Sequence, residues 1–242
     1  MENTLKIGLC FLSIGKDYKK WTKYSRQNKI LYCEKYNYAF IEDDILYDTS
    51  KPIPWSKIHL ILKYLPKYDY IVWIDADILV MNNKISLESI IEKYKEFNIV
   101  CGSCPRMINT GFMIIKNTDF CKDFLQAVFD NVYDSTEDPH ERYHNFEQGS
   151  FINLWDKNHL NCKEKIKVTN PREINSYWIN YHHGDFVLHG AGIRNETLEY
   201  FLNRFIPDRM DIDSDECYTE RIRYLREDFR SDHDELKARM GY

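Results

Sequence analysis

The stretch YIVWIDAD, from Tyr70 to Asp77, decides the fold class of this chain, because an apolar run leads directly into two carboxylates. A continuous apolar run closed by polar residues is typical of a central strand that is buried on both faces. Side chains alternate along a strand, so Asp75 and Asp77 are expected to point the same way at its carboxyl end. In open α/β sheets, ligands bind beyond that end of the strands.

Two neighbouring carboxylates repel each other unless a cation lies between them. Mg²⁺ and Mn²⁺ take oxygen ligands and commonly bridge to substrate phosphates. The local pattern therefore predicts a metal-held diphosphate site at Asp75 and Asp77. A solvated acidic loop after a strand would show the same two residues, so the pattern needs support from elsewhere in the chain.

The composition is that of a single globular domain. The chain has 242 residues, of which 43% are hydrophobic and 29% charged, and α/β domains of this length are often single. The formal net charge of −5, with the lysines scattered along the chain, argues against a nucleic-acid partner. Because no apolar span reaches about 18 residues, we expect no transmembrane helix, while peripheral membrane contact stays open.

The seven cysteines form neither a disulfide framework nor a strong metal motif. Their number is odd and their spacing irregular, unlike a disulfide-bonded scaffold. Cys101 and Cys104 make a lone C-x-x-C, and a zinc site would need a second pair. Since Met1 is followed almost directly by the first predicted strand, we expect no signal peptide. We therefore expect reduced thiols and a cytoplasmic location.

Predicted strands alternate with predicted helices along most of the chain. The strands are residues 5–12, 38–41, 70–74, 99–101, 111–115 and 186–189. The helices are residues 16–36, 55–65 and 87–97, one capped by Thr118, one beginning near Phe146, and one over 198–205. This alternation predicts an α/β fold, a mostly parallel sheet flanked by helices.

Two segments depart from this alternation. Residues 131–145 are polar and contain Pro139, which predicts a loop, and a substrate-facing position for it stays open. Residues 207–242 are rich in Asp, Glu and Arg but keep an amphipathic stripe. We interpret residues 1–206 as one catalytic domain and residues 207–242 as a charged, helical C-terminal extension that packs back or forms an oligomer.

A second signal lies far downstream, in the run HGAGIR from His189 to Arg194. A histidine can complete a carboxylate site for Mn²⁺, which accepts nitrogen more readily than Mg²⁺ does. Gly190 and Gly192 would let the backbone approach a diphosphate closely, and Arg194 would supply a cation to the phosphates. Taken alone, the run is also compatible with an ordinary glycine-rich turn.

Five runs of the chain, in order, are similar to the motifs of one known family. They are WSK at 55–57, WIDAD at 73–77, NTGF at 109–112, EQ at 147–148, and GDF at 184–186 with HGAG at 189–192. Over residues 5–205 the chain resembles the glycosyltransferases that include plant xyloglucan xylosyltransferases and fungal galactosyl- and mannosyltransferases of galactomannan and mannan synthesis. The resemblance implies a single-domain, Rossmann-like GT-A fold and transfer from a nucleotide sugar with retention at the anomeric carbon.

The resemblance also assigns metal ligands. Asp77 would bind the metal directly, Asp75 would bind the metal or the donor ribose, and His189 would be the third protein ligand. The implied cofactors are Mn²⁺ or Mg²⁺ and a nucleotide-sugar donor, with a UDP-sugar favoured over GDP-mannose.

Further residues are expected to bind the donor. Lys57 and Arg194 would lie near the diphosphate or the donor sugar, and Arg194 replaces a lysine of the family's xylosyltransferases, which changes the geometry but keeps the charge. Asn109 and Gly111 would line the donor-sugar pocket. The predicted donor-binding set is completed by Ser13, which closes the first predicted strand, and by Gly192.

Glu147 and Gln148 are the candidate catalytic residues. The glycosyl–phosphate bond is expected to break through an oxocarbenium-like state, with negative charge growing on the diphosphate. Gln148 resembles the family residue on the β-face of the sugar, where its amide oxygen would steady the anomeric carbon. A neutral amide is a poor nucleophile, so we favour same-face attack by the acceptor, with the departing phosphate as base. Glu147 would orient the acceptor or act as nucleophile; a plain polar helix start is the alternative.

The acceptor is expected to be a glycan, a glycolipid or a protein. Eukaryotic members of the family carry a membrane anchor and work in the Golgi, whereas we expect neither anchor nor stem in this protein. We therefore expect a soluble bacterial or viral relative that meets its acceptor from the cytoplasmic side.

Two other functions are compatible with part of the pattern. A phosphatase of the haloacid-dehalogenase type also has a strand leading into D-x-D. Its motif opens the chain, however, and carries Thr or Val where Leu79 stands here. A non-catalytic nucleotide-sugar-binding or assembly protein would have a decayed site, which the presence of Asp75, Asp77 and His189 together argues against.

Overall fold

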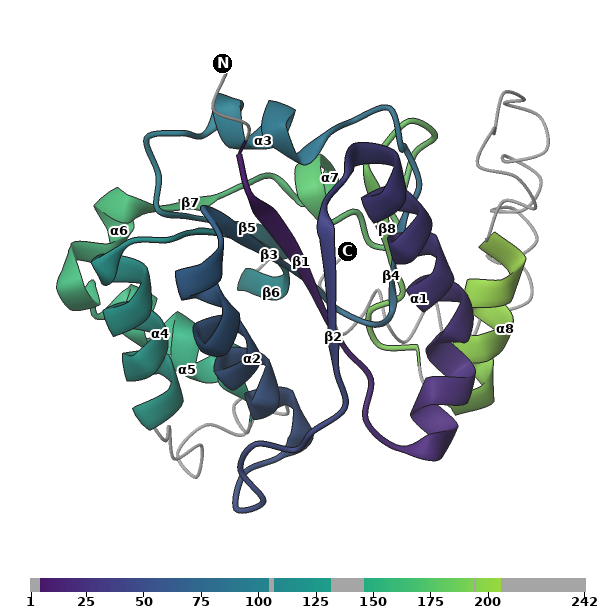
Figure 1. Cartoon of the computed structure of the whole chain (residues 1–242), viewed down its shortest axis with the longest axis horizontal. Coiled ribbons are helices and arrows are strands. Elements are labelled where there is room, and N and C mark those ends of the chain that lie inside the picture. The colour runs from purple at the N-terminus through teal and green to yellow at the C-terminus, as the bar shows by residue number, and fades with distance from the viewer. Residues whose placement is uncertain (1–4, 105–106, 132–145, 194, 206–242) are drawn as a thin grey trace.

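The strand that precedes Asp75 lies inside a six-stranded sheet with the order β2-β1-β3-β6-β5-β7 (Figure 1). The computed structural model describes residues 5–104, 107–131, 146–193 and 195–205. The pairs β1–β2, β1–β3 and β5–β7 are parallel, and β6 is antiparallel to both of its neighbours. The sheet is therefore mostly parallel, and the predicted α/β fold class is confirmed.

The elements have the following bounds. The six strands are β1 (Ile7–Leu12), β2 (Ala39–Asp43), β3 (Tyr70–Ile74), β5 (Ile99–Cys104), β6 (Met107–Lys116) and β7 (Ile166–Val168). The helices are α1 (Lys16–Tyr36), α2 (Ser56–Tyr64), α3 (Leu87–Lys93), α4 (Asp119–Asp130), α5 (Glu147–Asp156), α6 (Cys162–Lys165), α7 (Pro171–Ile174) and α8 (Asn195–Phe205).

Alternate side chains of β3 enter two different cores, which is why its run is apolar throughout. Ile71 and Trp73 belong to a cluster formed with α2, α4 and α5. Val72 and Ile74 belong to a second cluster, formed with α1 and α3. Figure 1 shows α2, α4 and α5 gathered on one side of the sheet and α1 on the other, with α8 packed against α1. The sheet is thus the middle of three layers.

A separate two-stranded sheet joins β4 (Ile78–Val80) to β8 (Val187–His189) in antiparallel register. It is fastened to α1 by Asn28, whose amide nitrogen donates to the Val80 carbonyl (2.9 Å) and whose amide oxygen accepts from the Val80 N–H (2.7 Å). Because β4 begins directly after Asp77, this small sheet fixes the direction of the backbone that follows the two carboxylates.

Several element boundaries differ from the predictions. Helix α1 has the predicted bounds, and Thr118 caps α4 by accepting a hydrogen bond from the Cys121 N–H (3.3 Å). The expected strand at 111–115 is instead the ten-residue β6, and α3 ends at Lys93 rather than at residue 97. Strand β4 was not predicted, because three residues are too short to show a period.

Some predictions fall on other parts of the chain. Residues 132–145 of the expected loop and the helical extension at 207–242 lie outside the described residues, so the division at residue 206 stays a prediction. Within the described residues, none of the helices combines the length and the apolar character needed to cross a bilayer.

Candidate functional site

Asp75 and Asp77 lie in a tight turn that follows β3. The strand ends at Ile74, and the Ile78 N–H donates to the Asp75 carbonyl (3.2 Å), which closes the turn before β4 begins. The Asp75 N–H donates to the Gly111 carbonyl on β6 (2.8 Å). The expectation that strand alternation aligns the two carboxylates is therefore wrong in its reason, because a turn brings them together.

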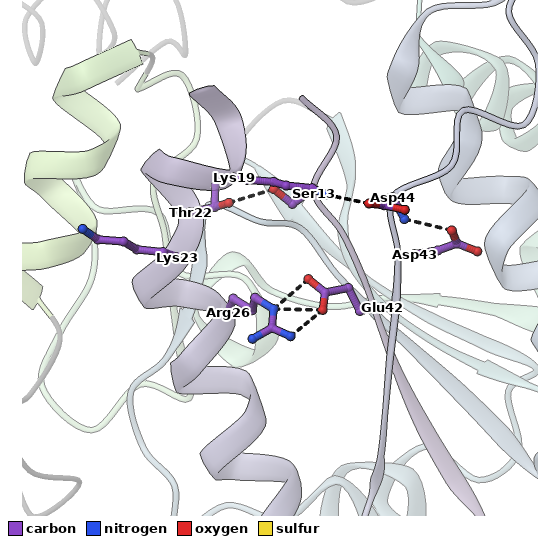
Figure 2. Close-up of a pocket in the computed structure, with 8 residues that line it drawn as sticks. All are labelled: Ser13, Lys19, Thr22, Lys23, Arg26, Glu42, Asp43 and Asp44. Carbon is purple, nitrogen blue, oxygen red and sulfur yellow. Dashed lines mark hydrogen bonds and ion pairs between the residues drawn. The ribbon is translucent and has the colours of Figure 1, made fainter. Parts of the chain in front are cut away.

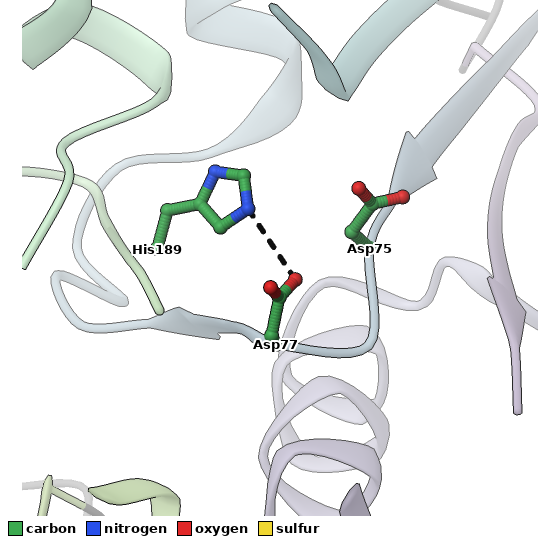
Figure 3. Close-up of side chains that lie close together, drawn as sticks. All are labelled: Asp75, Asp77 and His189. Carbon is green, nitrogen blue, oxygen red and sulfur yellow. Dashed lines mark ion pairs between the residues drawn. The ribbon is translucent and has the colours of Figure 1, made fainter. Parts of the chain in front are cut away.

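His189 meets both carboxylates, as the sequence predicted. One ligand atom from each of Asp75, Asp77 and His189 lies within 4.8 Å of the others (Figure 3). The His189 Nε2 is 3.3 Å from Asp77 Oδ1. The pairing of β4 with β8 explains this contact, because it places His189 opposite Ile78. Two carboxylates and one imidazole in this spacing fit a divalent cation such as Mn²⁺.

Gly111 makes room for this cluster. A Cβ at this position would lie 2.6 Å from His189 Cε1 and 3.1 Å from Asp75 Oδ2. Any larger residue would therefore push the imidazole and the carboxylate apart. The predicted place of Gly111 beside the site is thus explained by the close approach of β6 rather than by backbone conformation.

Asp75 is held in one orientation from two sides. Its Oδ1 accepts from Trp73 Nε1 (2.6 Å) and lies 3.2 Å from the Lys57 ammonium. Burial raises the pKa of Asp75, Lys57 opposes that shift, and the charge of Asp77 adds to it, so the pKa lies above its ordinary value. Trp73 and Lys57 both contact Oδ1, so Oδ2 is the carboxylate oxygen that remains for a ligand.

Asp77 has the opposite tendency. Burial raises its pKa, but the charge and hydrogen bond of His189 outweigh burial and hold the pKa below its ordinary value. One carboxylate of the pair thus resists ionisation while the other favours it.

Lys57 is a buried cation between carboxylates. Its Nζ lies 2.6 Å from Glu147 Oε1, 3.2 Å from Asp75 Oδ1 and 3.3 Å from the Thr110 carbonyl oxygen. Burial lowers the pKa of Lys57, but the charges of Asp75 and Glu147 outweigh burial and leave it raised. Lys57 therefore stays charged and fixes two acidic side chains at once.

Glu147 and Gln148 are the first two residues of α5. Glu147 is only 3% exposed, and its Oε1 accepts from Lys57 and from the Thr110 hydroxyl (3.2 Å). Its Oε2 is buried and has no hydrogen-bond partner among the described residues. A buried, unpaired carboxylate oxygen beside a cavity is suited to accept a hydrogen bond from a ligand.

The amide oxygen of Gln148, which was expected to face the sugar, is occupied by hydrogen bonds. Its Oε1 accepts from the Thr110 N–H (3.1 Å) and from the Asn109 Nδ2 (3.2 Å). Both lone pairs are therefore engaged, and this oxygen would reach an anomeric carbon only if those bonds were given up. The amide nitrogen lies 3.9 Å from the Met107 sulfur.

One cavity of about 620 Å³ contains most of the predicted site residues. Lys57, Asp75, Asp77, Asn109, Glu147, Gln148 and Gly192 line it. Aromatic side chains contribute the apolar part of its wall, namely Tyr18, Trp21, Trp73, Phe146 and Tyr177. Arg194 lies outside the described residues. A cavity with aromatic walls and a few convergent polar groups is typical of a small-molecule site.

Ser13 faces a different cavity, of about 450 Å³, at the carboxyl ends of β1 and β2 (Figure 2). Its hydroxyl lies 2.9 Å from that of Thr22 and is buried. The other lining residues are Lys19, Lys23, Arg26, Glu42, Asp43 and Asp44. Arg26 makes a bidentate ion pair with Glu42, from Nε to Oε1 and from Nη2 to Oε2, and Lys19 pairs with Asp44. The structure thus places Ser13 outside the cavity that Asp75 and Asp77 line.

Three residues of the site were missed by the sequence analysis. Asn175 places its Oδ1 2.8 Å from the His189 Nδ1. Beneath the D-x-D turn, the Lys29 Nζ donates to the Ile78 carbonyl (2.6 Å) and to the Ser25 hydroxyl (2.6 Å), which itself bonds the Ala76 carbonyl. Burial lowers the pKa of Lys29 to about 7. The available signal was the spacing of Ser25 and Lys29, one helical turn apart.

The fold is shared with a solved glycosyltransferase. A glycosyltransferase involved in the glycosylation of the major capsid of PBCV-1 is 14% identical, covers 82% of this chain and 98% of its own, and has a TM-score of 0.67. Mouse xyloside xylosyltransferase 1 (12% identity, 78% and 99% covered, TM-score 0.44) and the galactosyltransferase LgtC (12%, 93% and 99%, 0.45) are more distant. The architecture is GT-A, as expected.

The sequence leads to the same class of enzyme. The model of the galactosyl transferase GMA12/MNN10 family matches residues 9–101, which include Lys57, Asp75 and Asp77. None of the curated proteins compared with the chain matches it. The resemblance predicted from the motifs is confirmed over residues 9–101, and the family match together with the shared fold supports a glycosyltransferase.

Proposed function

We propose that this enzyme transfers a hexose or a pentose, with retention, from a nucleotide sugar to a glycan, a glycolipid or a protein, using a divalent cation held by Asp75, Asp77 and His189. The observation that carries the proposal is the convergence of these three ligand groups within 4.8 Å at a cavity of about 620 Å³. Three protein ligands would leave coordination positions for phosphate oxygens. The bound cation would act as a Lewis acid on the leaving diphosphate.

The residues around the cluster would prepare it for that ion. Trp73 and Lys57 hold Asp75 Oδ1, so Asp75 Oδ2 would be the ligand atom. Mn²⁺ suits the mixed oxygen and nitrogen donors better than Mg²⁺ does.

The donor would occupy both cavities. Asn109, Gly111 and Gly192 would flank the sugar and the diphosphate, and Glu147 Oε2 would accept a hydrogen bond from a sugar hydroxyl. The second cavity, with Ser13, would take the nucleoside, because it lies at the carboxyl ends of β1 and β2, where ligands of α/β sheets bind. Its acidic residues suit ribose hydroxyls, and a UDP-sugar is our preferred donor.

The chemistry would proceed by same-face attack. Glu147 is bound to Lys57 at 2.6 Å, which makes it a weak nucleophile and favours its role in orienting the substrate. Gln148, held by Thr110 and Asn109, would form one side of the sugar pocket. The acceptor hydroxyl would lose its proton to the departing phosphate, so no protein base is required. Arg194 is proposed to contact the phosphates.

The cellular setting belongs to the same proposal. The six cysteines among the described residues are all free thiols, which supports a reducing compartment such as the cytoplasm. Oligomerisation through residues 207–242 and peripheral contact with a membrane-bound acceptor complete the proposal.

A turnover assay tests the proposed function. The protein is incubated with Mn²⁺ and a panel of UDP- and GDP-sugars, and release of nucleoside diphosphate is measured. We expect release from one donor class, reduced about 100-fold or more in Asp77→Asn and His189→Gln. Asp123→Asn, on the exposed face of α4, is the matched control and should keep full activity.

Two outcomes would contradict the proposal. One is nucleoside diphosphate release that does not depend on a divalent cation. The other is release of inorganic phosphate from phosphomonoesters that Asp77→Asn leaves unchanged, which would point to a phosphohydrolase.

A further inference from the structure

Asn175 lies between the metal-ligand cluster and the sugar pocket and is fully buried. Its Oδ1 is 2.8 Å from the His189 Nδ1, on the side of the imidazole away from Asp77. Its Nδ2 is 3.1 Å from Asn109 Oδ1 and 3.4 Å from the Ser103 carbonyl oxygen. One side chain thus contacts a predicted metal ligand and a predicted donor-binding residue.

Two backbone groups determine which way the Asn175 amide points. The Gly111 N–H donates to Asn109 Oδ1 (2.9 Å), so the atom of Asn109 that faces Asn175 is an acceptor. The Ser103 carbonyl oxygen is also an acceptor. The Asn175 atom that faces both must be the NH₂ group, because only that end of the amide donates. Its oxygen therefore faces His189.

The orientation of the amide fixes the state of the imidazole. Since Asn175 offers an oxygen, the His189 Nδ1 must carry the hydrogen and donate it. In the neutral ring the other nitrogen, Nε2, is then an acceptor with a free lone pair. It is this atom that lies 3.3 Å from Asp77 Oδ1 within the ligand cluster.

The surrounding structure allows little movement of these side chains. A Cβ on Gly102 would lie 2.4 Å from the Asn175 Cβ, so the β5 backbone is packed directly against Asn175. The Tyr177 ring stacks on the His189 imidazole at 17° with centroids 5.1 Å apart. Asn109, which contacts Asn175, also donates to the Gln148 amide oxygen. That oxygen is fixed in turn because it accepts a hydrogen bond from the Thr110 N–H.

We propose that Asn175 is a positioning residue that holds His189 in the Nδ1-protonated tautomer, so that Nε2 faces the cluster ready to bind a metal. Through Asn109 it also ties that ligand to the donor-sugar pocket. The inference rests on the proposed function for its consequence, but the tautomer itself is a property of the protein without metal. Partners of this kind that orient a ligating histidine commonly affect metal affinity 10–100-fold.

The tautomer is tested by ¹⁵N NMR of the imidazoles in metal-free protein, with the His189 signals assigned from the His189→Gln spectrum. We expect the wild-type ring to be protonated at Nδ1, and Asn175→Leu to lose that preference. A wild-type ring protonated at Nε2 would overturn the proposal, whatever the enzyme's activity. This readout keeps the inference separate from the proposed function, which would fail if the wild type bound no Mn²⁺.

Metal affinity is tested by titrating Mn²⁺ into three variants. Asn175→Leu should bind about 10–100-fold more weakly than wild type. Asn175→Asp keeps an acceptor for Nδ1 and should bind within a few-fold of wild type, although it loses the bonds to Asn109 and Ser103. Asn117→Leu, which removes a remote side-chain bond to the Tyr68 carbonyl (3.0 Å), is the control and should bind normally.

The order of the variants separates positioning from plain stability. A purely structural role predicts that Asn175→Asp is at least as harmful as Asn175→Leu, because a buried negative charge replaces an amide. Equal loss of Mn²⁺ affinity in both variants, or none in Asn175→Leu, would overturn the proposal. If Asn175→Leu does not fold, the ¹⁵N spectrum of the wild type and the Mn²⁺ affinity of Asn175→Asp still test the proposal.

Discussion

Lys29 is a buried ammonium in direct contact with no carboxylate among the described residues. It donates instead to the Ile78 carbonyl and to the Ser25 hydroxyl. These two hydrogen bonds hold the turn that contains Asp75 and Asp77. Its positive charge is near both acids without touching either, which eases their mutual repulsion. The cost is desolvation of the ammonium, which lowers the pKa of Lys29 to about 7.

This pKa predicts a pH-dependent stability. Between about pH 7 and the ordinary lysine pKa of 10.5, the unfolded chain binds a proton that folded Lys29 has released, so the free energy of unfolding rises with pH. Relative to Lys29→Met, the wild type should gain about 1–2 kcal/mol between pH 6.5 and 8.5. Urea unfolding of metal-free protein at the two pH values measures the gain. A difference that does not change with pH would contradict it.

The Lys57–Glu147 pair predicts strong coupling between two residues. Lys57→Met leaves two carboxylates without their buried cation and should cost about 3–5 kcal/mol of unfolding free energy. In the double variant Lys57→Met/Glu147→Leu, part of that loss should return, because fewer buried charges remain unpaired. A double-mutant cycle by urea unfolding gives the coupling energy, and simple additivity of the two losses would be the contrary result.

At the scale of elements, α1 supports the cluster formed by Asp75, Asp77 and His189. It contacts β4 through Asn28 and the D-x-D turn through Ser25 and Lys29, so one helix positions the segment on which Asp77 lies. Its buried face is polar for this reason, which is unusual for a long helix against a sheet. The cluster therefore depends on a helix that contributes no ligand to it.

Asn28→Ala tests this dependence. It leaves the buried N–H and carbonyl of Val80 without their partner and should cost about 2–3 kcal/mol of unfolding free energy. It should also weaken Mn²⁺ binding, because β4 is released. Gln27→Ala, on the exposed face of the same helix, is the control and should stay within about 0.5 kcal/mol of wild type. Unchanged Mn²⁺ affinity in a destabilised Asn28→Ala would argue against the support role.

The predictability of these elements follows from what a sequence pattern contains. The bounds of α1 and the buried nature of β3 are local properties, and both were predicted. The direction of β6 was not, because an apolar run reads the same in either direction. Strand β4 is too short to show a period.

The roles of Asn175 and Lys29 could not be predicted from the sequence. Asn175 contacts His189 and Lys29 contacts the Ile78 carbonyl, and a single sequence does not show that these distant groups meet. The sequence motifs predicted that Asp75, Asp77 and His189 belong to one site, but they did not predict the side chains that hold these three residues in place.

At the scale of the whole molecule, metal binding should stabilise the domain. A ligand present at about 100 times its Kd adds about 2.7 kcal/mol to the native state. For a chain of this size each kcal/mol raises the Tm by about 2–4 °C. Saturating Mn²⁺ should therefore raise the Tm of the wild type by about 5–10 °C, measured by thermal unfolding. Asp77→Asn should show little shift, and an equal shift in that variant would place the ion elsewhere.

The pairing of β4 with β8 has a consequence for the order of assembly. It sets Ile78 opposite His189, so the third ligand joins the other two only after nearly the whole domain has been synthesised. Contacts that span so much chain close slowly, since the entropy of the intervening loop must be lost first. If the proposed function is right, capture of the divalent cation is expected to mark the last step of maturation, and nascent chains released before β8 would fail to retain the ion.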